Sequence, residues 1–238
     1  MSEWKAKRFW TTASVVPVGD GFTVHLDGRA VRTPAKAALV LPTESLAREI
    51  AGEWDAQDGV IDPSAMPFTR SANAAIDKVA AQHEEVATLI AAYGDSDLLC
   101  YRSDGPEDLV ARQCKAWDPL LDWAESDLRV HLTRTTGIIH HAQPAEALET
   151  LGNLVRNQDD FALTALHDLV SLSGSLIIGL AAQKGIEATD ALWNVSRIDE
   201  DWQIEKWGAD DEASALAQYK KQAFCHAKRF YDLSRSRV

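Results

Sequence analysis

The stretch ALWNVSRIDEDWQIEKWG, residues 191–208, predicts the element around which the helical part of the chain is organised. At about 100° per residue, a single helix here has two apolar faces with an acid set into each. The first face holds Asp199 with Ala191, Leu192, Val195, Ile198 and Trp202, and the second holds Glu200 with Trp193, Ile204 and Trp207. Because covering a core requires only one apolar face, the second predicts packing against another element or contact with a partner.

Local residues predict where this helix begins and ends, but they do not predict its function. Thr189 is expected to cap the start, and Gly208 to end the helix in a left-handed conformation. In one interpretation the helix is a central core element whose acids pair with Arg or Lys. In the other, Asp199 or Glu200 anchors a partner or reacts with a substrate. Spacing alone does not choose between them.

Length and charge limit the possible functions. The 238 residues allow one large domain or two small ones, and 46% hydrophobic residues with eight Trp predict a substantial core. Acids outnumber Lys and Arg by 36 to 24, which gives a net charge of −12. Nucleic acids and anionic membranes are bound through basic surfaces, so neither is expected as a partner. A basic patch on a protein is the better electrostatic match.

Cysteine usage and hydropathy predict a cytoplasmic protein. Cys100, Cys114 and Cys225 are odd in number and far apart, without CxxC or zinc-ligand spacing, as expected of free thiols in a reducing compartment. The first ten residues, MSEWKAKRFW, lack the apolar core of a signal peptide and the composition of a transit peptide. Ser and Gly interrupt the longest apolar run, Leu169–Ala182, which favours a buried helix over a membrane span.

The N-terminal part of the chain mixes strands with helices. Residues 8–42 alternate in polarity around the turns Asp20-Gly21 and Asp27-Gly28, which predicts a small antiparallel meander with a further short strand at 39–41. Helices are predicted at 43–57, 70–81 and 84–93, with a loop at 60–67. Residues 98–102 form a strand or an extended link.

Beyond residue 105 the pattern is helical. Helices are predicted at 107–128, from Pro144 to 156, at 161–183 and at 210–233, with a kink or break at Asp118 before Pro119. Ser171, Ser175 and Gly179 would give the helix at 161–183 a flat side for close helix packing. The fold class is α+β, with a small N-terminal α+β domain at 1–102 and a larger helical domain at 103–238. Val130–Thr136 could return to the N-terminal sheet.

Motifs for catalysis or cofactor binding are weak. The sequence has no GxxxxGK[ST], no GxGxxG after a strand and no GxSxG, so nucleotide binding is not expected. His140-His141 is better explained as a solvated loop than as a metal site, and His167 with Asp168 as a hydrogen-bonded pair. Asp199 and Glu200 diverge by about 100° on a helix, which makes a poor acid–base pair. We therefore expect no cofactor, no metal and no enzymatic activity.

The central stretch also carries a resemblance to a known family. SRIDEDWQIEKWG (196–208) resembles the signature of the ATP12 family, assembly chaperones for the F1 sector of ATP synthase. Other similar segments follow the same order along nearly the whole chain: Leu26–Arg29 through Arg32–Pro34, Glu53–Asp55, Leu99–Arg102, and Trp117–Pro119 through Trp123-Ala124. The expected absence of a transit peptide favours a bacterial member.

The resemblance implies a fold, a partner and a site. It implies a small α+β domain before a larger helical one, in a non-enzymatic protein that binds the free F1 α subunit and shields the surface that β later occupies. The functionally important acid falls at Asp199 or Glu200, and we favour Glu200 because it lies on the second, Trp-bearing face. The residues expected to bind the partner are Glu200, Asp199, Trp193, Trp207, Gln203 and Glu205.

Two other functions remain as alternatives. One is a small-molecule enzyme with a site between the two domains, which would show turnover or dependence on ATP or metal. The other is a stable structural subunit of a larger complex, which would stay in finished ATP synthase, whereas a chaperone leaves.

Overall fold

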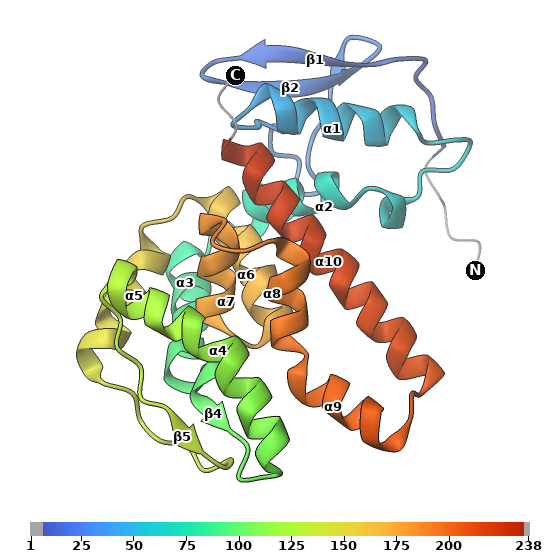
Figure 1. The fold of residues 1–238 in the computed structure, drawn as a ribbon. Coiled ribbons are helices and arrows are strands. Elements are labelled where there is room, and N and C mark those ends of the chain that lie inside the picture. Colours follow the sequence, from blue (N-terminus) through green and yellow to red (C-terminus); the bar gives the residue numbers. More distant parts are fainter. Residues whose placement is uncertain (1–6, 236–238) are drawn as a thin grey trace. The chain divides into compact units, whose positions relative to one another are not determined.

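The alternating residues near the N-terminus form the expected antiparallel sheet. The structure, a computed structural model, describes residues 7–235. Strands β1 (Ala13–Val18), β2 (Gly21–Leu26) and β3 (Arg29–Ala30) lie in that order. Figure 1 shows β1 beside β2. Asp27 and Gly28 both have positive φ, 47° and 81°, as the predicted tight hairpin turn requires. The strand expected at 39–41 is reduced to a single bridge between Leu41 and Phe22.

The free edge of β1 is protected against further strand pairing. The Ala13 N–H donates a hydrogen bond of 2.8 Å to the Asp55 carboxylate, and Pro17 has no N–H to donate. The backbone N–H groups of alternate residues point to the same edge of a strand. Of Ala13, Val15 and Pro17, only Val15 therefore has an N–H that could bond another strand. The edge therefore offers a poor template for another strand.

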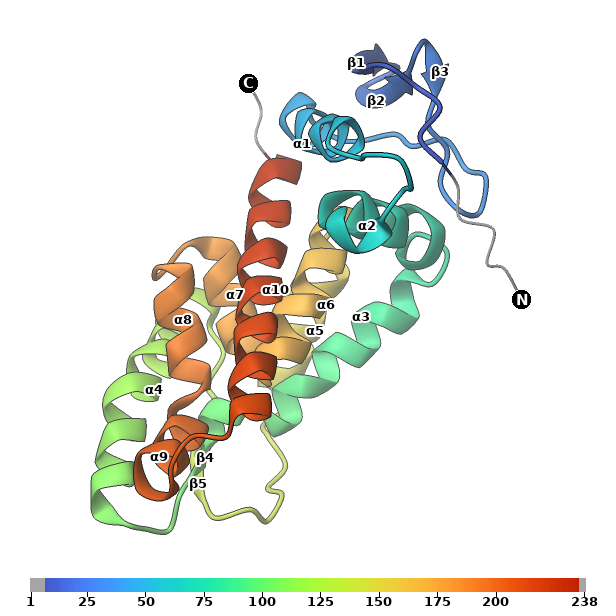
Figure 2. The same ribbon diagram turned by 90° about the vertical axis from the view of Figure 1, so that its right-hand side faces the viewer.

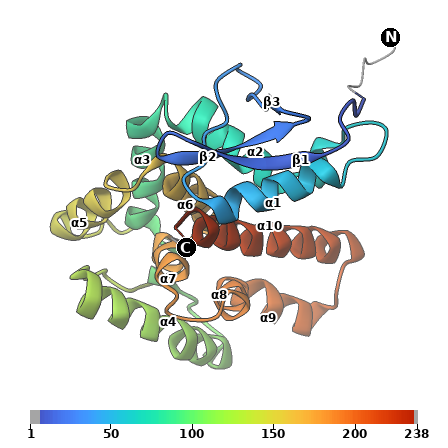
Figure 3. The same cartoon turned by 90° about the horizontal axis from the view of Figure 1, so that it is seen from above.

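Helix α1 (Glu44–Asp55) packs along this sheet (Figure 3). It begins where predicted, because Thr43 Oγ1 accepts a hydrogen bond of 3.2 Å from the Leu46 N–H. Leu46 and Ile50 are fully buried in one core with residues of β2. Ala165 and Phe230 belong to the same core although they lie far away in the sequence.

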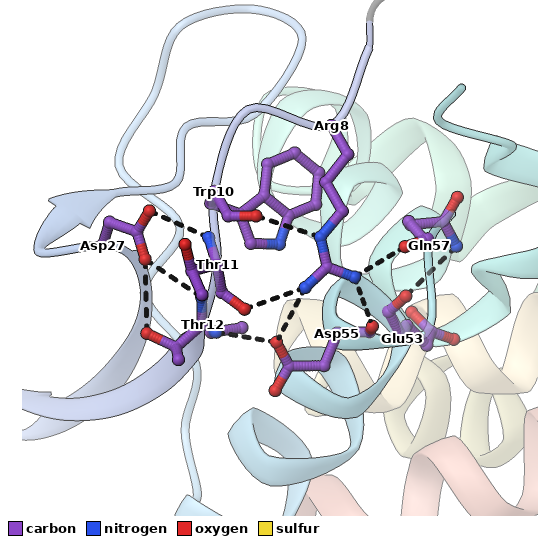
Figure 4. Close-up of polar contacts among 9 residues, drawn as sticks. Arg8, Trp10, Thr11, Thr12, Asp27, Glu53, Asp55 and Gln57 are labelled. Carbon is purple, nitrogen blue, oxygen red and sulfur yellow. Dashed lines mark hydrogen bonds and ion pairs between the residues drawn. The ribbon is translucent and has the colours of Figure 1, made fainter. Parts of the chain in front are cut away.

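A single arginine holds the segment that leads into β1 (Figure 4). The Arg8 guanidinium donates to four backbone carbonyls, those of Trp10, Thr11, Asp55 and Gln57, at 2.6–3.0 Å. Two of these carbonyls lie at the C-terminal end of α1, where a cation also complements the helix dipole. Arg8 thereby joins the segment before β1 to the end of α1.

The remaining elements are mainly helical. They are a 3₁₀ turn (Pro63–Ala65), α2 (Pro67–Ala74), a π-helix (Ala75–Val79), α3 (His83–Ala91), 3₁₀ turns (Ala92–Ser96 and Leu98–Cys100), β4 (Tyr101–Arg102), α4 (Glu107–Leu128), β5 (Thr135–Thr136), α5 (Ala145–Arg156), α6 (Asp160–Ser173), α7 (Leu176–Lys184), α8 (Thr189–Ser196), α9 (Ile198–Trp207) and α10 (Asp211–Arg235). The α+β class expected from the sequence is confirmed. Of the kink or break expected at Asp118, the break is wrong, because α4 continues through Pro119.

The long helix expected at 161–183 is in fact two. Gly174 has φ 74°, which ends α6, and the Ser175 hydroxyl accepts from the Ile178 N–H at 3.0 Å to begin α7. The expected stripe of small residues is therefore not continuous. Gly179 nevertheless packs closely, since a Cβ built there would lie 2.7 Å from Val170 Cγ2.

A buried carboxylate fixes this helix break. Asp97 is fully buried and accepts hydrogen bonds from Ser175 Oγ at 2.7 Å, from the Ile177 N–H at 3.0 Å and from the Leu99 N–H at 3.0 Å. Burial raises the pKa of Asp97 to about 6, although these hydrogen bonds oppose the shift. One acid thus joins the start of α7 to the turn before β4.

Val130–Thr136 does not return to the N-terminal sheet. Only Thr135–Thr136 forms a strand, β5, and it pairs in parallel with β4. Earlier in the segment, the Gln143 side chain hydrogen bonds both backbone groups of Thr133, at 2.7 and 3.0 Å. These groups are thereby satisfied without a neighbouring strand.

The chain groups into two units whose limits differ from the division expected at residue 102. The first contains residues 7–82, 160–165 and 229–235 of the described chain, and the second contains 83–159 and 166–228. Residues 83–102 group with the second unit because α3 packs against α5, and His83 Nε2 lies 3.1 Å from the Arg156 carbonyl. Phe161 and Phe230 group with the first, where their rings stack at 6.0 Å.

Candidate partner-binding site

The segment that the sequence singles out lies in the second unit and contains two helices, not one. Arg197, with φ −109° and ψ 8°, separates α8 from α9. Ser196 directs its hydroxyl to the Trp193 carbonyl at 2.7 Å, which competes with continued helix hydrogen bonding. The N-cap is Ala188, so Thr189 does not cap as expected. Gly208 ends α9 with a positive φ of 93°, but its ψ of 161° lies outside the left-handed helical region.

This break separates the two tryptophans expected on one face. Trp193 is 4% exposed and packs against Phe224 of α10, with ring centroids 5.7 Å apart. The Arg197 guanidinium lies 5.8 Å from the Trp193 ring centroid. Trp207, at the end of α9, is 79% exposed. The expectation that Trp193 shares an accessible face with Trp207 is therefore wrong.

Asp199 connects α9 to α4. Its carboxylate accepts a hydrogen bond of 2.6 Å from the side-chain amide of Gln113, which is 1% exposed. The Gln113 carbonyl oxygen in turn accepts from the Ser103 N–H at 2.8 Å. A buried amide with both ends bonded holds one orientation, so the position of Asp199 is fixed.

Trp202 and Glu205 strengthen the same connection. Trp202 is buried between two cations, with Arg112 at 5.2 Å and Lys206 at 4.6 Å from its ring. Arg112 also binds both carboxylate oxygens of Glu205, at 2.8 and 2.9 Å. These hydrogen bonds lower the pKa of Glu205. Glu205 therefore contributes to holding α9 on α4.

The remaining predicted residues are on the accessible side of α9. The Glu200 side chain is 45% exposed and accepts a hydrogen bond of 2.7 Å from Arg197 Nη1. Gln203 is exposed, as are Ile204 at 37% and Trp207 at 79%. The structure thus leaves a half-exposed acid, an exposed amide and two exposed apolar side chains on a helix anchored from its other side. We call Glu200, Gln203, Ile204 and Trp207 the α9 surface.

Two residues that anchor α9 were not predicted from the sequence. Gln113 and Arg112 lie on α4 and contact α9 through Asp199 and Glu205. A signal for Gln113 was present, because Leu109, Gln113 and Trp117 follow at intervals of four and share the buried face of α4. The partners of Arg112 and Gln113 are about ninety residues away, and no local pattern indicates them.

The other chemically suggestive residues form pairs. His140 Nε2 lies 3.0 Å from Asp95, and His167 Nδ1 lies 3.0 Å from Asp168, which raises the pKa of His167 by hydrogen bonding. Within residues 7–235, no three His, Cys, Asp or Glu side chains are grouped so that they could hold a metal ion. A depression of about 400 Å³ in the second unit is lined by Glu125, Arg129, His131, Pro144, Glu146 and Ala147. Among the helices of residues 7–235, none is both long and apolar enough to cross a membrane.

Several of the segments that resemble the ATP12 family make stabilising contacts within their own unit. In the first unit, Asp27 accepts from the Thr11 and Thr12 N–H groups at 2.9 and 3.0 Å, and Asp55 binds the Ala13 N–H. In the second unit, Arg102 binds Asp118 at 2.6 Å and lies 4.9 Å from the Trp117 ring. These contacts hold elements together within each unit, whereas the α9 surface belongs to another family-like segment, residues 196–208.

Comparison with known proteins finds relatives of this chain. The profile of the ATP12 chaperone protein family matches residues 7–125. The mitochondrial protein atp12 of Schizosaccharomyces pombe is 28% identical over 223 residues, which cover 88% of this chain and 76% of the yeast protein.

Solved structures extend the similarity over almost the whole chain. Two structures of Atp12 from Paracoccus denitrificans, one with a single substitution, are each 50% identical with a TM-score of 0.95 and cover 98% of this chain and 100% of their own. The Atu1473 protein of Agrobacterium tumefaciens is 40% identical with a TM-score of 0.88, over 94% of this chain and 84% of its own. The chain therefore belongs to the ATP12 chaperone family.

Proposed function

We propose that this ATP12-family chaperone of ATP synthase assembly binds the free α subunit of F1 and covers its β-facing surface until β arrives. We infer the identity of the partner from the resemblance of residues 196–208 to the family signature. Its action is binding and release, without catalysis. Glu200 is the acid that faces the partner, and Asp199 is the acid that positions α9.

The observation that carries this proposal is the exposed Trp207 on an anchored helix. Trp207 is 79% exposed, while Trp202, five residues earlier, is buried between Arg112 and Lys206. A large aromatic ring that stays in solvent on a fixed element is typical of a contact residue in a protein interface. Its acidic neighbour Glu200 would favour a basic client surface.

A chaperone must also release its client. The α9 surface presents few large apolar side chains, so burial against a client would give modest affinity and rapid dissociation. The β subunit can then replace the chaperone by competing for the same surface of α. The net charge of −12 would add to association rate more than to residence time.

Capture of α subunit expressed without β tests the proposal. Glu200→Lys should weaken binding at least tenfold while circular dichroism and the unfolding midpoint stay unchanged. Glu149→Lys introduces the same charge change at an exposed position on α5 and should bind α like the wild type. Equal capture of α by wild type and a folded Glu200→Lys variant would contradict the assignment of Glu200.

Added β subunit distinguishes a chaperone from a permanent subunit. We expect β to displace the protein from α, and finished ATP synthase to lack it. Its retention at one copy per complex would favour the structural-subunit alternative. Turnover in a substrate screen would instead favour an enzyme.

We also propose that the protein acts in the cytoplasm. Cys100, Cys114 and Cys225 are all free thiols, and Cys100 is buried with its pKa raised to about 12 by desolvation. Unpaired cysteines are usual in a reducing compartment. Fractionation of cells that express the native protein tests this assignment.

A further inference from the structure

The end of α9 and the start of α10 are exposed on every side. Residues 203–216 are all exposed, a run of fourteen that includes the connection between the two helices. Figure 2 shows this connection as a short link from α9 to the first turn of α10. We call residues 203–219, which all lie in the second unit, the distal arm.

The distal arm carries large apolar side chains that its own unit leaves partly or largely exposed. Trp207 and Ile204 are exposed on α9, and on α10 Leu216 is 54% and Tyr219 is 62% exposed. Glu212, Leu216 and Tyr219 follow at intervals of four and three, so an acid and two apolar residues share one face of α10. By contrast, Phe224, further along α10, is fully buried against Trp193.

The charge of the arm is strongly one-sided. Its acids are Glu205, Asp210, Asp211 and Glu212, and its one basic residue is Lys206. Glu205 is neutralised by Arg112, Asp210 caps α10 by accepting from the Ala213 N–H at 2.8 Å, and Lys206 lies over Trp202. Asp211 and Glu212 form no salt bridge within residues 7–235. Two acids are thus left beside exposed apolar residues.

We infer that the distal arm extends the α9 surface, with which it shares Gln203, Ile204 and Trp207, as a docking surface onto the start of α10. It takes a client segment whose apolar side chains are flanked by Lys or Arg. The inference rests on the proposed function for the identity of the client, and on Leu216, Tyr219, Asp211 and Glu212 for its chemistry. Opposite charge would place the client's basic residues against Asp211 and Glu212. Its apolar residues would cover Leu216 and Tyr219.

Binding to two probes tests the inference. The first is the α subunit expressed without β, and the second is an 18-residue amphipathic helical peptide of Leu and Lys, compared with its Leu/Glu counterpart. The double variants Leu216→Ser/Tyr219→Ser and Asp211→Lys/Glu212→Lys alter the arm. Ile138→Ser/Ile139→Ser is the matched control, because these side chains are 98% and 82% exposed in a loop of the same unit.

Both arm variants should weaken α binding at least tenfold, the charge variant should also abolish the preference for the Leu/Lys peptide, and the control should do neither. Only the charge variant should lose the salt dependence of binding. Unchanged α binding by both arm variants, with Glu200→Lys still impaired, would overturn this inference and leave the proposed function standing. Failure of the wild type to bind α, with arm-dependent binding of the Leu/Lys peptide, would overturn the choice of client alone. Loss of binding in the Ile138/Ile139 control would move the docking surface elsewhere.

Discussion

The buried side-chain amide of Gln113 donates a 2.6 Å hydrogen bond to the carboxylate of Asp199, which fixes the first turn of α9 on α4. Of the two adjacent acids in the family-like segment, Asp199 therefore has a buried partner on another helix, while Glu200, whose side chain is 45% exposed, is bound by the neighbouring Arg197. The two side chains leave α9 in different directions. We therefore assign a positioning role to Asp199 and a contact role to Glu200.

Removal of Asp199 should destabilise the protein. Asp199→Ala leaves the buried Gln113 amide without its acceptor, which costs about 1–3 kcal/mol in the free energy of unfolding. Asp199→Asn keeps an acceptor and should recover most of this loss. Urea denaturation gives the values, and Asp201→Ala, at an exposed neighbouring position, should remain within about 0.5 kcal/mol of wild type.

Asp97 should make stability fall as pH rises. Its folded pKa of about 6 lies above the ordinary value of 3.8, so the folded state binds the proton more tightly than the unfolded chain does. This favourable contribution is complete below pH 4, is lost between about pH 4 and 6, and reaches about 3 kcal/mol at most. In Asp97→Asn the free energy of unfolding should fall less steeply over this range. Parallel slopes for the two proteins in urea titrations at pH 4, 5, 6 and 7 would refute the assignment to Asp97.

A methyl group at Gly179 should disrupt the packing of α7 on α6. Its Cβ would meet Val170 Cγ2 at 2.7 Å and Leu166 Cδ1 at 3.1 Å, so Gly179→Ala should cost about 1–3 kcal/mol. Gly52 is the control, because a Cβ at this position in α1 has nothing within 4 Å. Gly52→Ala should raise stability by about 0.5–1 kcal/mol through helix propensity. Thermal unfolding that ranked the two variants equally would contradict the packing argument.

Loss of Arg8 should loosen the segment before β1. The side chain donates to four backbone carbonyls, so Arg8→Ala should cost about 1–3 kcal/mol and speed hydrogen exchange at the N–H groups of Thr11 and Thr12. Arg8→Lys should not restore protection, because an ammonium group cannot reproduce the planar fork. Arg29→Ala, at an exposed position in β3, should leave exchange at Thr11 and Thr12 unchanged.

Local sequence determined the parts of this protein whose signals lie within a few residues. Asp27-Gly28 specified a hairpin turn because both residues accept positive φ, and Thr43 specified the start of α1 by capping it. The apolar period of 107–128 gave the bounds of α4. The family-like segment 196–208 indicated the region of the candidate site, together with its acids and Trp207.

Tertiary structure decided what depends on partners distant in the chain. Whether Trp193 or Trp207 is accessible follows from Phe224, which covers only Trp193, and the separate roles of Asp199 and Glu200 follow from Gln113. The start of α7 is held by Asp97, about eighty residues earlier. Helical periodicity assigns a residue to a face, but the side chain that packs on that face is supplied by another element. Burial, and with it the choice between anchoring and contact, is therefore fixed only once the chain has folded.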